Sequence, residues 1–208
     1  MTLLIIRHGE TPLNVARVMQ PANTPLSDHG QAQAAALARR LQTGQPLAPA
    51  GIVSSDLPRA LQTAEAIARA CGLPVITTPL LHERNFGDLR GRLYDSLGFD
   101  PLTSADAPPN GESQADFSAR CAAAWAWVLA QQATLGGPLA VVTHGLVIRE
   151  WLHRGPLQLP PHLAAPERLS NTSLTVATAQ APHAVDLVDC TAHLDDGVGV
   201  DANSLSGG

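Results

Sequence analysis

The 208-residue sequence contains no lysine, because all 13 of its basic residues are arginine. Covalent chemistry through a lysine amine is therefore excluded. Aromatic residues make up only 3% of the chain, which disfavours an aromatic stacking platform for nucleic acid. The net charge of −5 provides no general attraction to nucleic acid or to an anionic membrane. An anion site must therefore be local, and arginine guanidinium groups suit the binding of phosphate.

Cysteines and long apolar runs are also scarce. The 3 cysteines are far apart and show no CxxC spacing, so we expect neither a disulfide framework nor a thiolate metal site. The opening residues "MTLLIIRHGE" lack the basic segment and cleavage site of a signal peptide, and no run approaches the length of a membrane span. We therefore expect a cytoplasmic protein with reduced thiols and no membrane partner.

Short apolar segments alternate along the chain with segments of helical periodicity. The apolar segments predict strands at 2–6, 51–56, 73–81, 138–145, 173–178 and 184–188, and the periodic segments predict helices at 27–42, 57–72, 113–133 and 146–154. This alternation predicts an α/β domain with a mainly parallel sheet covered on both faces. We expect one domain over residues 1–194, an irregular excursion over 92–113, and a flexible tail over 195–208.

Two of the predicted strands end in the same dipeptide. His8 and Gly9 follow the first strand, and His144 and Gly145 end the fourth. A single histidine at such a position is more often structural than catalytic, but two at equivalent places favour a common site. Ligands of parallel sheets bind beyond the carboxyl ends of the strands. Glycine permits the close backbone approach that a loop around a phosphate requires.

Two further charged residues follow strands of the same predicted sheet. Arg59 lies on the opening turn of the second helix, and Glu83 comes directly after the segment 73–81. Each alone would be interpreted as a solvent-exposed side chain. Together with Arg7, His8 and His144, they form a set that contains a base, an acid and two guanidinium groups, which is suited to chemistry on a phosphate ester.

Six sequence blocks resemble the successive motifs of the histidine phosphatase superfamily, the phosphoglycerate mutase-like proteins. They are "LIIRHGETPLN", "NTPLSDHGQAQA", "SSDLPRALQTAEAI", "HERNFGDLRG", "NGES" and "VVTHGLVIRE", in the family's order over most of residues 3–150. The resemblance implies a three-layer α/β/α sandwich and a phosphohistidine mechanism that uses neither a metal nor another cofactor.

The resemblance also implies a role for each matching residue. His8 matches the nucleophile and Glu83 the general acid and base, while Arg7, Arg59 and His144 match the pocket that holds the transferred phosphoryl group. Asn14 matches a polar phosphate contact. Further substrate contacts with weaker specificity are expected from Thr11, Gln20 and the loop glycine Gly145. Pro21 departs from the family, whose members often have glycine there.

We therefore expect a metal-independent phosphomonoesterase that acts on small phosphorylated metabolites. The runner-up is a cofactor-dependent phosphoglycerate mutase, but the mutases carry several basic residues after the acid motif, and here residues 93–119 contain none. A non-catalytic phosphate-binding protein of the same fold is a third hypothesis. A metallohydrolase is a fourth, although the chain has no HExxH motif. The sequence leaves the physiological substrate and the oligomeric state open.

Overall fold

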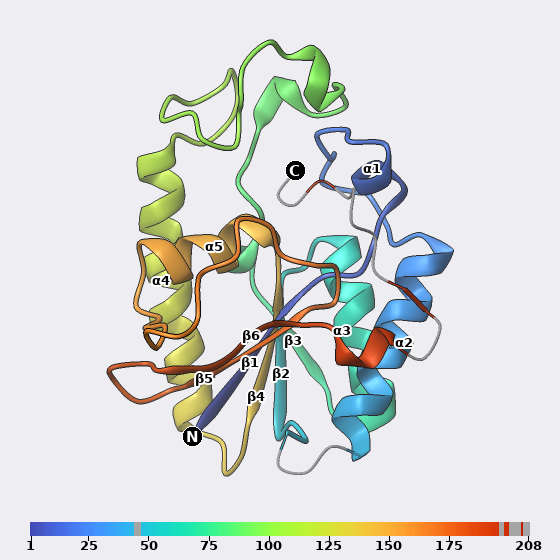
Figure 1. Cartoon of the computed structure of the whole chain (residues 1–208), viewed down its shortest axis with the longest axis vertical. Coiled ribbons are helices and arrows are strands. Elements are labelled where there is room, and N and C mark those ends of the chain that lie inside the picture. Colours follow the sequence, from blue (N-terminus) through green and yellow to red (C-terminus); the bar gives the residue numbers. More distant parts are fainter. Residues whose placement is uncertain (44–46, 196–197, 200–204, 206–208) are drawn as a thin grey trace.

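The computed structural model describes residues 1–43, 47–195, 198–199 and 205 (Figure 1). Its strands are β1 (Thr2–Arg7), β2 (Gly51–Ser54), β3 (Val75–Thr77), β4 (Leu139–Thr143), β5 (Leu174–Thr178) and β6 (Val185–Cys190). Its helices are α1 (Pro12–Val15), α2 (Asp28–Thr43), α3 (Pro58–Cys71), α4 (Gln114–Ala133) and α5 (Gly145–His153). Short 3-10 turns occur at Pro79–Leu81, Gly87–Leu89, Tyr94–Ser96 and Ala192–Leu194.

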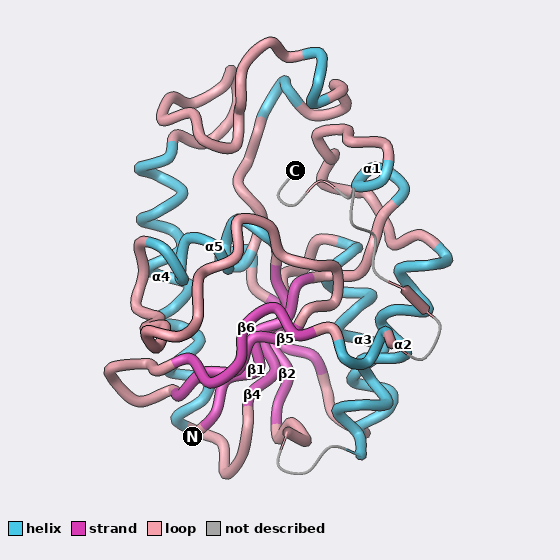
Figure 2. Tube along the Cα trace, viewed as in Figure 1, coloured by secondary structure: helices cyan, strands magenta, loops and turns pink. Residues whose placement is uncertain are grey.

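The strands form one sheet in the order β3-β2-β4-β1-β5-β6. The pairs β3-β2, β2-β4 and β4-β1 are parallel, whereas β5 runs antiparallel to β1 and β6 antiparallel to β5. The predicted mainly parallel sheet is therefore confirmed, and its antiparallel part comes from the last two strands of the chain. Figure 2 shows the strands in the middle of the molecule with helices around them.

The central strands β1, β2 and β4 are buried on both faces, as their apolar sequences predict, whereas the edge strands β3 and β6 are partly exposed. Along β1, Leu3 and Ile5 join a hydrophobic cluster that contains residues of α4 and α5, while Leu4 and Ile6 join another that contains residues of α2 and α3. Successive side chains of a strand point to opposite faces, so the clusters lie on the two sides of the sheet. Figure 1 shows α2 and α3 on one side and α4 and α5 on the other. The expected three layers are thus confirmed.

The predicted strand at 73–81 is shorter than expected. Only Val75–Thr77 pairs with β2, and a 3-10 turn follows at Pro79–Leu81. Pro79 has no backbone N–H to continue the ladder. The Thr78 side chain accepts a hydrogen bond from the Leu80 amide at 3.3 Å, which stabilises the turn instead. This turn redirects the chain toward Glu83.

The predicted excursion over 92–113 is irregular and contains only the short turn at Tyr94–Ser96. In Figures 1 and 2 it extends beyond the end of the sheet opposite the N-terminus. The buried guanidinium of Arg84 holds it in place, with hydrogen bonds to the carbonyl oxygens of Ser104, Asp106 and Glu112 at 2.9–3.2 Å. The excursion is thus attached to a fixed point beside Glu83.

The expected flexible tail at 195–208 falls mostly on residues 196–197, 200–204 and 206–208, which lie outside the described residues. Leu205, by contrast, is buried and its amide donates to the Asn14 carbonyl oxygen at 3.1 Å. This tail residue therefore packs against the domain. Within the described part of the chain, no helix has both the length and the apolar character needed to cross a membrane.

Two glycines allow the loop after β1 to pack directly against the start of α2. A Cβ atom on Gly30 would lie 2.0 Å from the carbonyl oxygen of Glu10, and one on Gly9 would lie 2.7 Å from the carbonyl oxygen of Gly30. Neither backbone can move away easily, because the Glu10 amide also donates to Gln33 Oε1 at 2.9 Å. The loop that contains His8 therefore depends on the absence of a side chain at both positions.

We predict that Gly30→Ala destabilises the protein by about 1–3 kcal/mol, because the added methyl group forces the backbone of the His8 loop away from α2. Urea unfolding measures the change. Gly136→Ala is the matched control, since no atom lies within 4 Å of a Cβ atom there, and we expect a change within about 0.5 kcal/mol. Equal free energies of unfolding for the two variants would show that the close approach of Gly30 to the Glu10 carbonyl oxygen does not exclude a side chain.

Candidate active site

The register of the central strands brings the two predicted histidines together. Arg7 of β1 is paired with Thr143 of β4, and the next residues are His8 and His144. The His8 amide donates to the Thr143 carbonyl oxygen at 3.0 Å, which extends the pairing by one step. The two imidazole rings have centroids 5.1 Å apart and are tilted by 59°. The structure therefore places the two His-Gly pairs at one site.

His8 has the protonation state of a nucleophile. Its Nδ1 lies 2.7 Å from the carbonyl oxygen of Gly9, and because a carbonyl only accepts hydrogen bonds, Nδ1 carries the proton. The lone pair is thus on Nε2. Burial lowers the pKa of His8 well below its usual range, and the nearby cations Arg59 and Arg7 lower it further. The ring is therefore neutral at physiological pH and able to attack an electrophile.

His144 is also buried and neutral. Burial is the largest cause that lowers its pKa well below the usual range, followed by the charge of Arg59. Its Nε2 lies 2.9 Å from the hydroxyl oxygen of Ser55, which directly follows β2. Its Nδ1 is buried and has no hydrogen-bond partner within the part of the chain that the structure describes. His144 can therefore offer one ring nitrogen to a bound group while Ser55 holds the other.

Arg59 supplies a buried positive charge next to the histidines. It lies in the first turn of α3, where Pro58 begins the helix, and only 2% of the residue is exposed. Its Nη1 is 3.5 Å from the Pro21 carbonyl oxygen, and its Nε has no partner among the described residues. Burial lowers its pKa to about 10, so the group stays charged at neutral pH. A buried cation without an ion pair favours the binding of an anion.

Thr63 links Arg59 to the His8 loop. Its hydroxyl donates to the Arg59 carbonyl oxygen at 2.8 Å and accepts from the Gly9 amide at 3.0 Å. This one side chain therefore fixes the first turn of α3 relative to the residue that follows His8.

Glu83 lies at the same site with its carboxyl group fixed. One oxygen accepts from the Arg84 amide at 3.0 Å, and the other from the Leu146 amide in the first turn of α5 at 3.1 Å. Burial raises its pKa, although these hydrogen bonds and the charge of Arg59 act in the opposite direction. Glu83 therefore holds its proton to a higher pH than a free glutamate, which suits a general acid.

The backbone before Glu83 is fixed by Arg120 of α4. The Arg120 guanidinium donates to the carbonyl oxygens of Leu80, His82 and Glu83 at 2.9, 2.7 and 3.2 Å. In addition, the Thr143 hydroxyl donates to the Leu81 carbonyl oxygen at 2.8 Å. The loop with the acid is thus connected both to a helix and to the strand that carries His144.

The remaining predicted contacts lie around α1. Asn14 Nδ2 and Arg7 Nη2 each donate to the carbonyl oxygen of Leu205 at 2.9 Å, and Arg7 Nη1 donates to the Leu169 carbonyl oxygen. Thr11 caps α1 and donates to Gln20 Oε1 at 2.7 Å. Asn14 and Arg7 are therefore aimed at one acceptor, while Thr11 and Gln20 bind each other.

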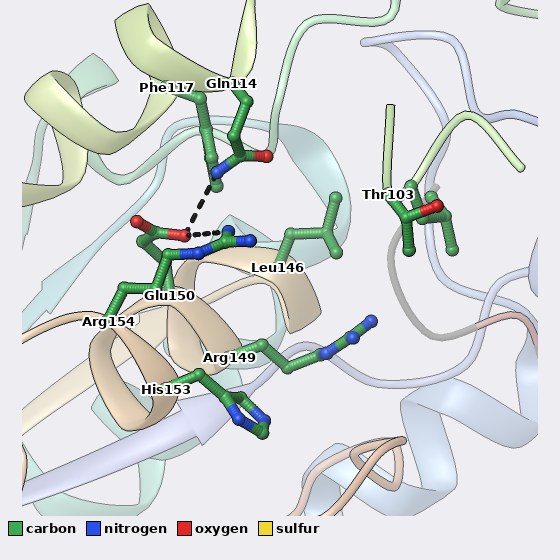
Figure 3. Close-up of a pocket in the computed structure, with 9 residues that line it drawn as sticks. Thr103, Gln114, Phe117, Leu146, Arg149, Glu150, His153 and Arg154 are labelled. Carbon is green, nitrogen blue, oxygen red and sulfur yellow. Dashed lines mark hydrogen bonds and ion pairs between the residues drawn. The ribbon is translucent and has the colours of Figure 1, made fainter. Parts of the chain in front are cut away.

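A pocket next to α5 is lined by residues of α4, α5 and the excursion (Figure 3). Gln114, at the start of α4, donates to Glu150 at 3.1 Å, and Arg154 is paired with the same carboxylate at 3.2 Å. In Figure 3, Leu146 lies between this network and Thr103 of the excursion, and Arg149 points away from Glu150. Helix α5, whose Leu146 amide donates to Glu83, is therefore also bound to the start of α4 through Glu150.

The described residues contain no group of three or more His, Cys, Asp or Glu side chains with the arrangement of a metal site. The polar groups around His8 are instead two guanidinium groups, a second imidazole and a carboxyl group. This donor set suits an anion better than a cation.

Sequence reasoning missed several residues of the site. Ser55 and Thr63 stand within the block "SSDLPRALQTAEAI", but neither was assigned a role. The only available signal was their position inside a matched motif. Leu205 had no signal, because it belongs to a segment whose composition is typical of a flexible tail.

Comparison with known proteins agrees with this geometry. The model of the histidine phosphatase superfamily (branch 1) matches residues 3–187. The chain is 35% identical over 211 residues to a probable phosphoglycerate mutase GpmB of Yersinia enterocolitica, with 94% of this chain and 95% of that protein covered.

Solved structures of known proteins are similar as well. A mycobacterial glucosyl-3-phosphoglycerate phosphatase is 31% identical, with a TM-score of 0.72 and coverage of 91% of this chain and 98% of that one. YhfR of Bacillus stearothermophilus is 29% identical, with a TM-score of 0.77 and coverage of 93% and 99%. The sequence resemblance, the sheet with its paired histidines and the match over nearly the whole chain agree, and the protein belongs to the histidine phosphatase superfamily, branch 1.

Proposed function

We propose that the protein is a metal-independent phosphomonoesterase that hydrolyses small phosphorylated metabolites through a phosphohistidine on His8. The observation that carries the proposal is a neutral, buried imidazole whose Nε2 holds the lone pair, beside a buried cation, Arg59, and a carboxyl group of raised pKa, Glu83. The similar mycobacterial enzyme is named as a phosphatase and has been solved with inorganic phosphate, which supports an anionic phosphate ligand.

In the first step, Nε2 of His8 attacks phosphorus in line with the ester oxygen. The Nε2–P bond forms, the P–O bond to the alcohol breaks, and Glu83 transfers its proton to the departing oxygen. The phosphorylated ring keeps the Nδ1 proton and becomes cationic. Its hydrogen bond to the Gly9 carbonyl oxygen stabilises that charge, because charge-assisted hydrogen bonds are stronger than neutral ones.

In the second step, water replaces His8 on phosphorus. The ionised Glu83 accepts a proton from the water molecule, the new P–O bond forms, the Nε2–P bond breaks, and inorganic phosphate leaves. His8 is again neutral and Glu83 is again protonated. A dianionic substrate near Glu83 raises the pKa of that carboxyl group further, which returns it to the acid form required for the next cycle.

The phosphoryl group would be held by charge and by directed donors. Arg59 provides a nearby charge, and the unpartnered Nδ1 of His144 provides a ring nitrogen for an equatorial oxygen. We assign Arg7 and Asn14 to the same group, which requires the phosphate to replace the Leu205 carbonyl oxygen as their acceptor. Gly145, at the start of α5, leaves space for backbone approach.

Thr11 and Gln20 are proposed as outer contacts of the substrate. Both are buried near α1, and their mutual hydrogen bond at 2.7 Å holds the Gln20 amide group in a defined direction. They would position the bound ester and take no part in proton transfer.

A phosphoglycerate mutase is the second candidate, favoured by the name of the Yersinia relative. The phosphatase is preferred because residues 93–119 supply no basic side chain to hold a second phosphate group. The two activities are separated by one measurement: a mutase primed with bisphosphoglycerate interconverts phosphoglycerates faster than it releases phosphate, and a phosphatase does the reverse.

We predict that the protein releases phosphate from p-nitrophenyl phosphate in excess EDTA. His8→Ala should lower turnover by roughly three orders of magnitude or more, because the nucleophile is lost. His162→Ala is the control, since His162 is exposed and has no role in the proposed site. A rapid acid quench with radiolabelled substrate should trap a phosphoenzyme in the wild type and none in His8→Ala.

Other outcomes of this experiment contradict specific parts of the proposal. Activity that EDTA abolishes and zinc restores would indicate a metallohydrolase. Vanadate binding without turnover of any phosphate ester would indicate a non-catalytic phosphate-binding protein.

Glu83→Gln should affect substrates according to their leaving group. We expect turnover of an alkyl phosphate to fall by roughly 10²–10⁴-fold, because its alkoxide requires a proton, and that of p-nitrophenyl phosphate to fall much less. In the wild type, alkyl phosphate turnover should decline as the pH rises through the raised pKa of Glu83, and this decline should be absent in the variant. Glu65→Gln, at an exposed position on α3, is the control. Equal slowing of both substrates would exclude Glu83 as the proton donor.

A further inference from the structure

One peptide unit connects His8 to the carbonyl group that fixes its ring. The Nδ1 proton of His8 is held by the Gly9 carbonyl oxygen at 2.7 Å, so the direction of Nε2 depends on where that carbonyl group points. Glycine restricts its own backbone less than any other residue does. The peptide between His8 and Gly9 must therefore be fixed by groups outside it.

The carbonyl end of this peptide is held by the turn that precedes β5. The His8 carbonyl oxygen accepts hydrogen bonds from Asn171 Nδ2 at 3.1 Å and from the Thr172 amide at 3.2 Å. A carbonyl oxygen has two lone pairs, and both are used here. Asn171 is 3% exposed and Thr172 is fully buried, so these donors rather than bulk water hold the carbonyl group in place.

The amide end of the same peptide is held by α3. The Gly9 amide donates to the Thr63 hydroxyl at 3.0 Å, and that hydroxyl donates to the Arg59 carbonyl oxygen at 2.8 Å. The C=O and N–H groups of a planar trans peptide point in opposite directions. Asn171 and Thr63 therefore bind the His8–Gly9 peptide from its two sides, and a rotation of the peptide plane would break hydrogen bonds at both.

The turn that supplies the carbonyl donors has an unfavourable backbone conformation. Thr172 has a φ angle of 54°, in the left-handed region that β-branched residues rarely adopt. Its hydroxyl donates to the Asn171 carbonyl oxygen at 2.7 Å and lies 3.0 Å from His193 Nε2. Burial lowers the pKa of His193 to about 4, so this contact involves a neutral ring. Such conformations persist only where the surroundings impose them, and they are concentrated at functional sites.

On the basis of the proposed function, in which His8 is the nucleophile, we propose that Asn171 and Thr63 are positioning residues for phosphoryl transfer. They hold the His8–Gly9 peptide so that the Gly9 carbonyl oxygen keeps the proton on Nδ1 and leaves Nε2 unprotonated. Neither residue touches the reacting atoms. The same arrangement stabilises the phosphohistidine, because its cationic ring requires the Gly9 carbonyl oxygen as an acceptor.

The first test separates kcat from the binding of phosphate. Asn171→Ala removes one donor to the His8 carbonyl oxygen and leaves Arg59 and His144 in place. We expect kcat for p-nitrophenyl phosphate to fall by roughly 10- to 100-fold, because small displacements of a reacting group are costly. The inhibition constant of inorganic phosphate should change by less than about 3-fold, since the groups that bind the anion remain.

Gln132→Ala is the matched control for this variant. Gln132 is also a buried side-chain amide that donates to a backbone carbonyl oxygen, that of Gly137 at 2.9 Å. Gly137 precedes β4, whereas His144 follows the other end of that strand, so the contact lies away from the site. We expect Gln132→Ala to lower the free energy of unfolding and to leave kcat unchanged.

The second test requires no turnover, because the nitrogen NMR shifts of the His8 ring report which nitrogen carries the proton. The His8 signals are identified by their absence from His8→Ala. We expect a protonated Nδ1 and an unprotonated Nε2 in the wild type and in Gln132→Ala, and a mixture of the two neutral forms in Asn171→Ala. Thr63→Val should give the same mixture, and Thr63→Ser, which keeps the hydroxyl, should restore the wild-type shifts.

The proposal is overturned if Asn171→Ala and Thr63→Val have the ring shifts of the wild type, or if Asn171→Ala loses no more kcat than Gln132→Ala. If Asn171→Ala does not fold, the comparison of Thr63→Val with Thr63→Ser decides in the same way. Failure of the proposed function gives a different result, namely a wild-type protein that hydrolyses no phosphate ester. The ring shifts of the variants then still support or contradict the positioning role.

Discussion

The site depends on the in-register parallel pairing of β1 with β4. Arg7 opposite Thr143 leaves His8 and His144 at adjacent strand ends, and the hydrogen bond from the His8 amide to Thr143 holds that arrangement beyond the last paired residues. A shift of one residue would turn every side chain of β1 to the other face of the sheet and would separate the rings. Because the apolar residues of β1 are buried on both faces, such a shift is opposed by both halves of the core.

Burial shifts the pKa values of the proposed nucleophile and the proposed acid in opposite directions. It lowers the pKa of His8, which favours the neutral imidazole, and it raises the pKa of Glu83, so that this carboxyl group holds its proton to a higher pH than a free glutamate. In both cases the low-dielectric surroundings disfavour the charged form. The buried Arg59 strengthens the first effect and opposes the second. In the proposed function, a bound phosphate dianion would compensate the charge of Arg59 and favour the protonated form of Glu83.

Most of the fold could be predicted from the sequence. Short apolar segments indicate buried strands, and apolar residues at helical spacing indicate helices with one buried face. The exception was β3, where a β-branched run predicted a long strand and the turn that begins at Pro79 ended it. For the site, the repeated His-Gly pair at strand ends identified the centre. Ser55 and Thr63 were not assigned roles, since a hydroxyl residue after a strand or inside a helix has no distinctive pattern. The place of Leu205 depends on tertiary contacts with Asn14 and Arg7, which no local pattern records.

The candidate active site and the irregular excursion belong to different parts of the fold. His8, His144 and Arg59 follow strands of the central sheet, whereas the excursion over 92–113 follows the acid motif and is held by Arg84 and, through Glu112, by Arg120. Glu83 connects the two parts: its backbone is bound by Arg120 and its carboxyl group by the amide of Leu146. Because the residues around His8 are held in place without the excursion, residues of the excursion can vary without moving the proposed phosphoryl site. Arg120 binds the carbonyl oxygens of Leu80, His82 and Glu83, so a substitution at Arg120 should alter the position of the proposed acid itself.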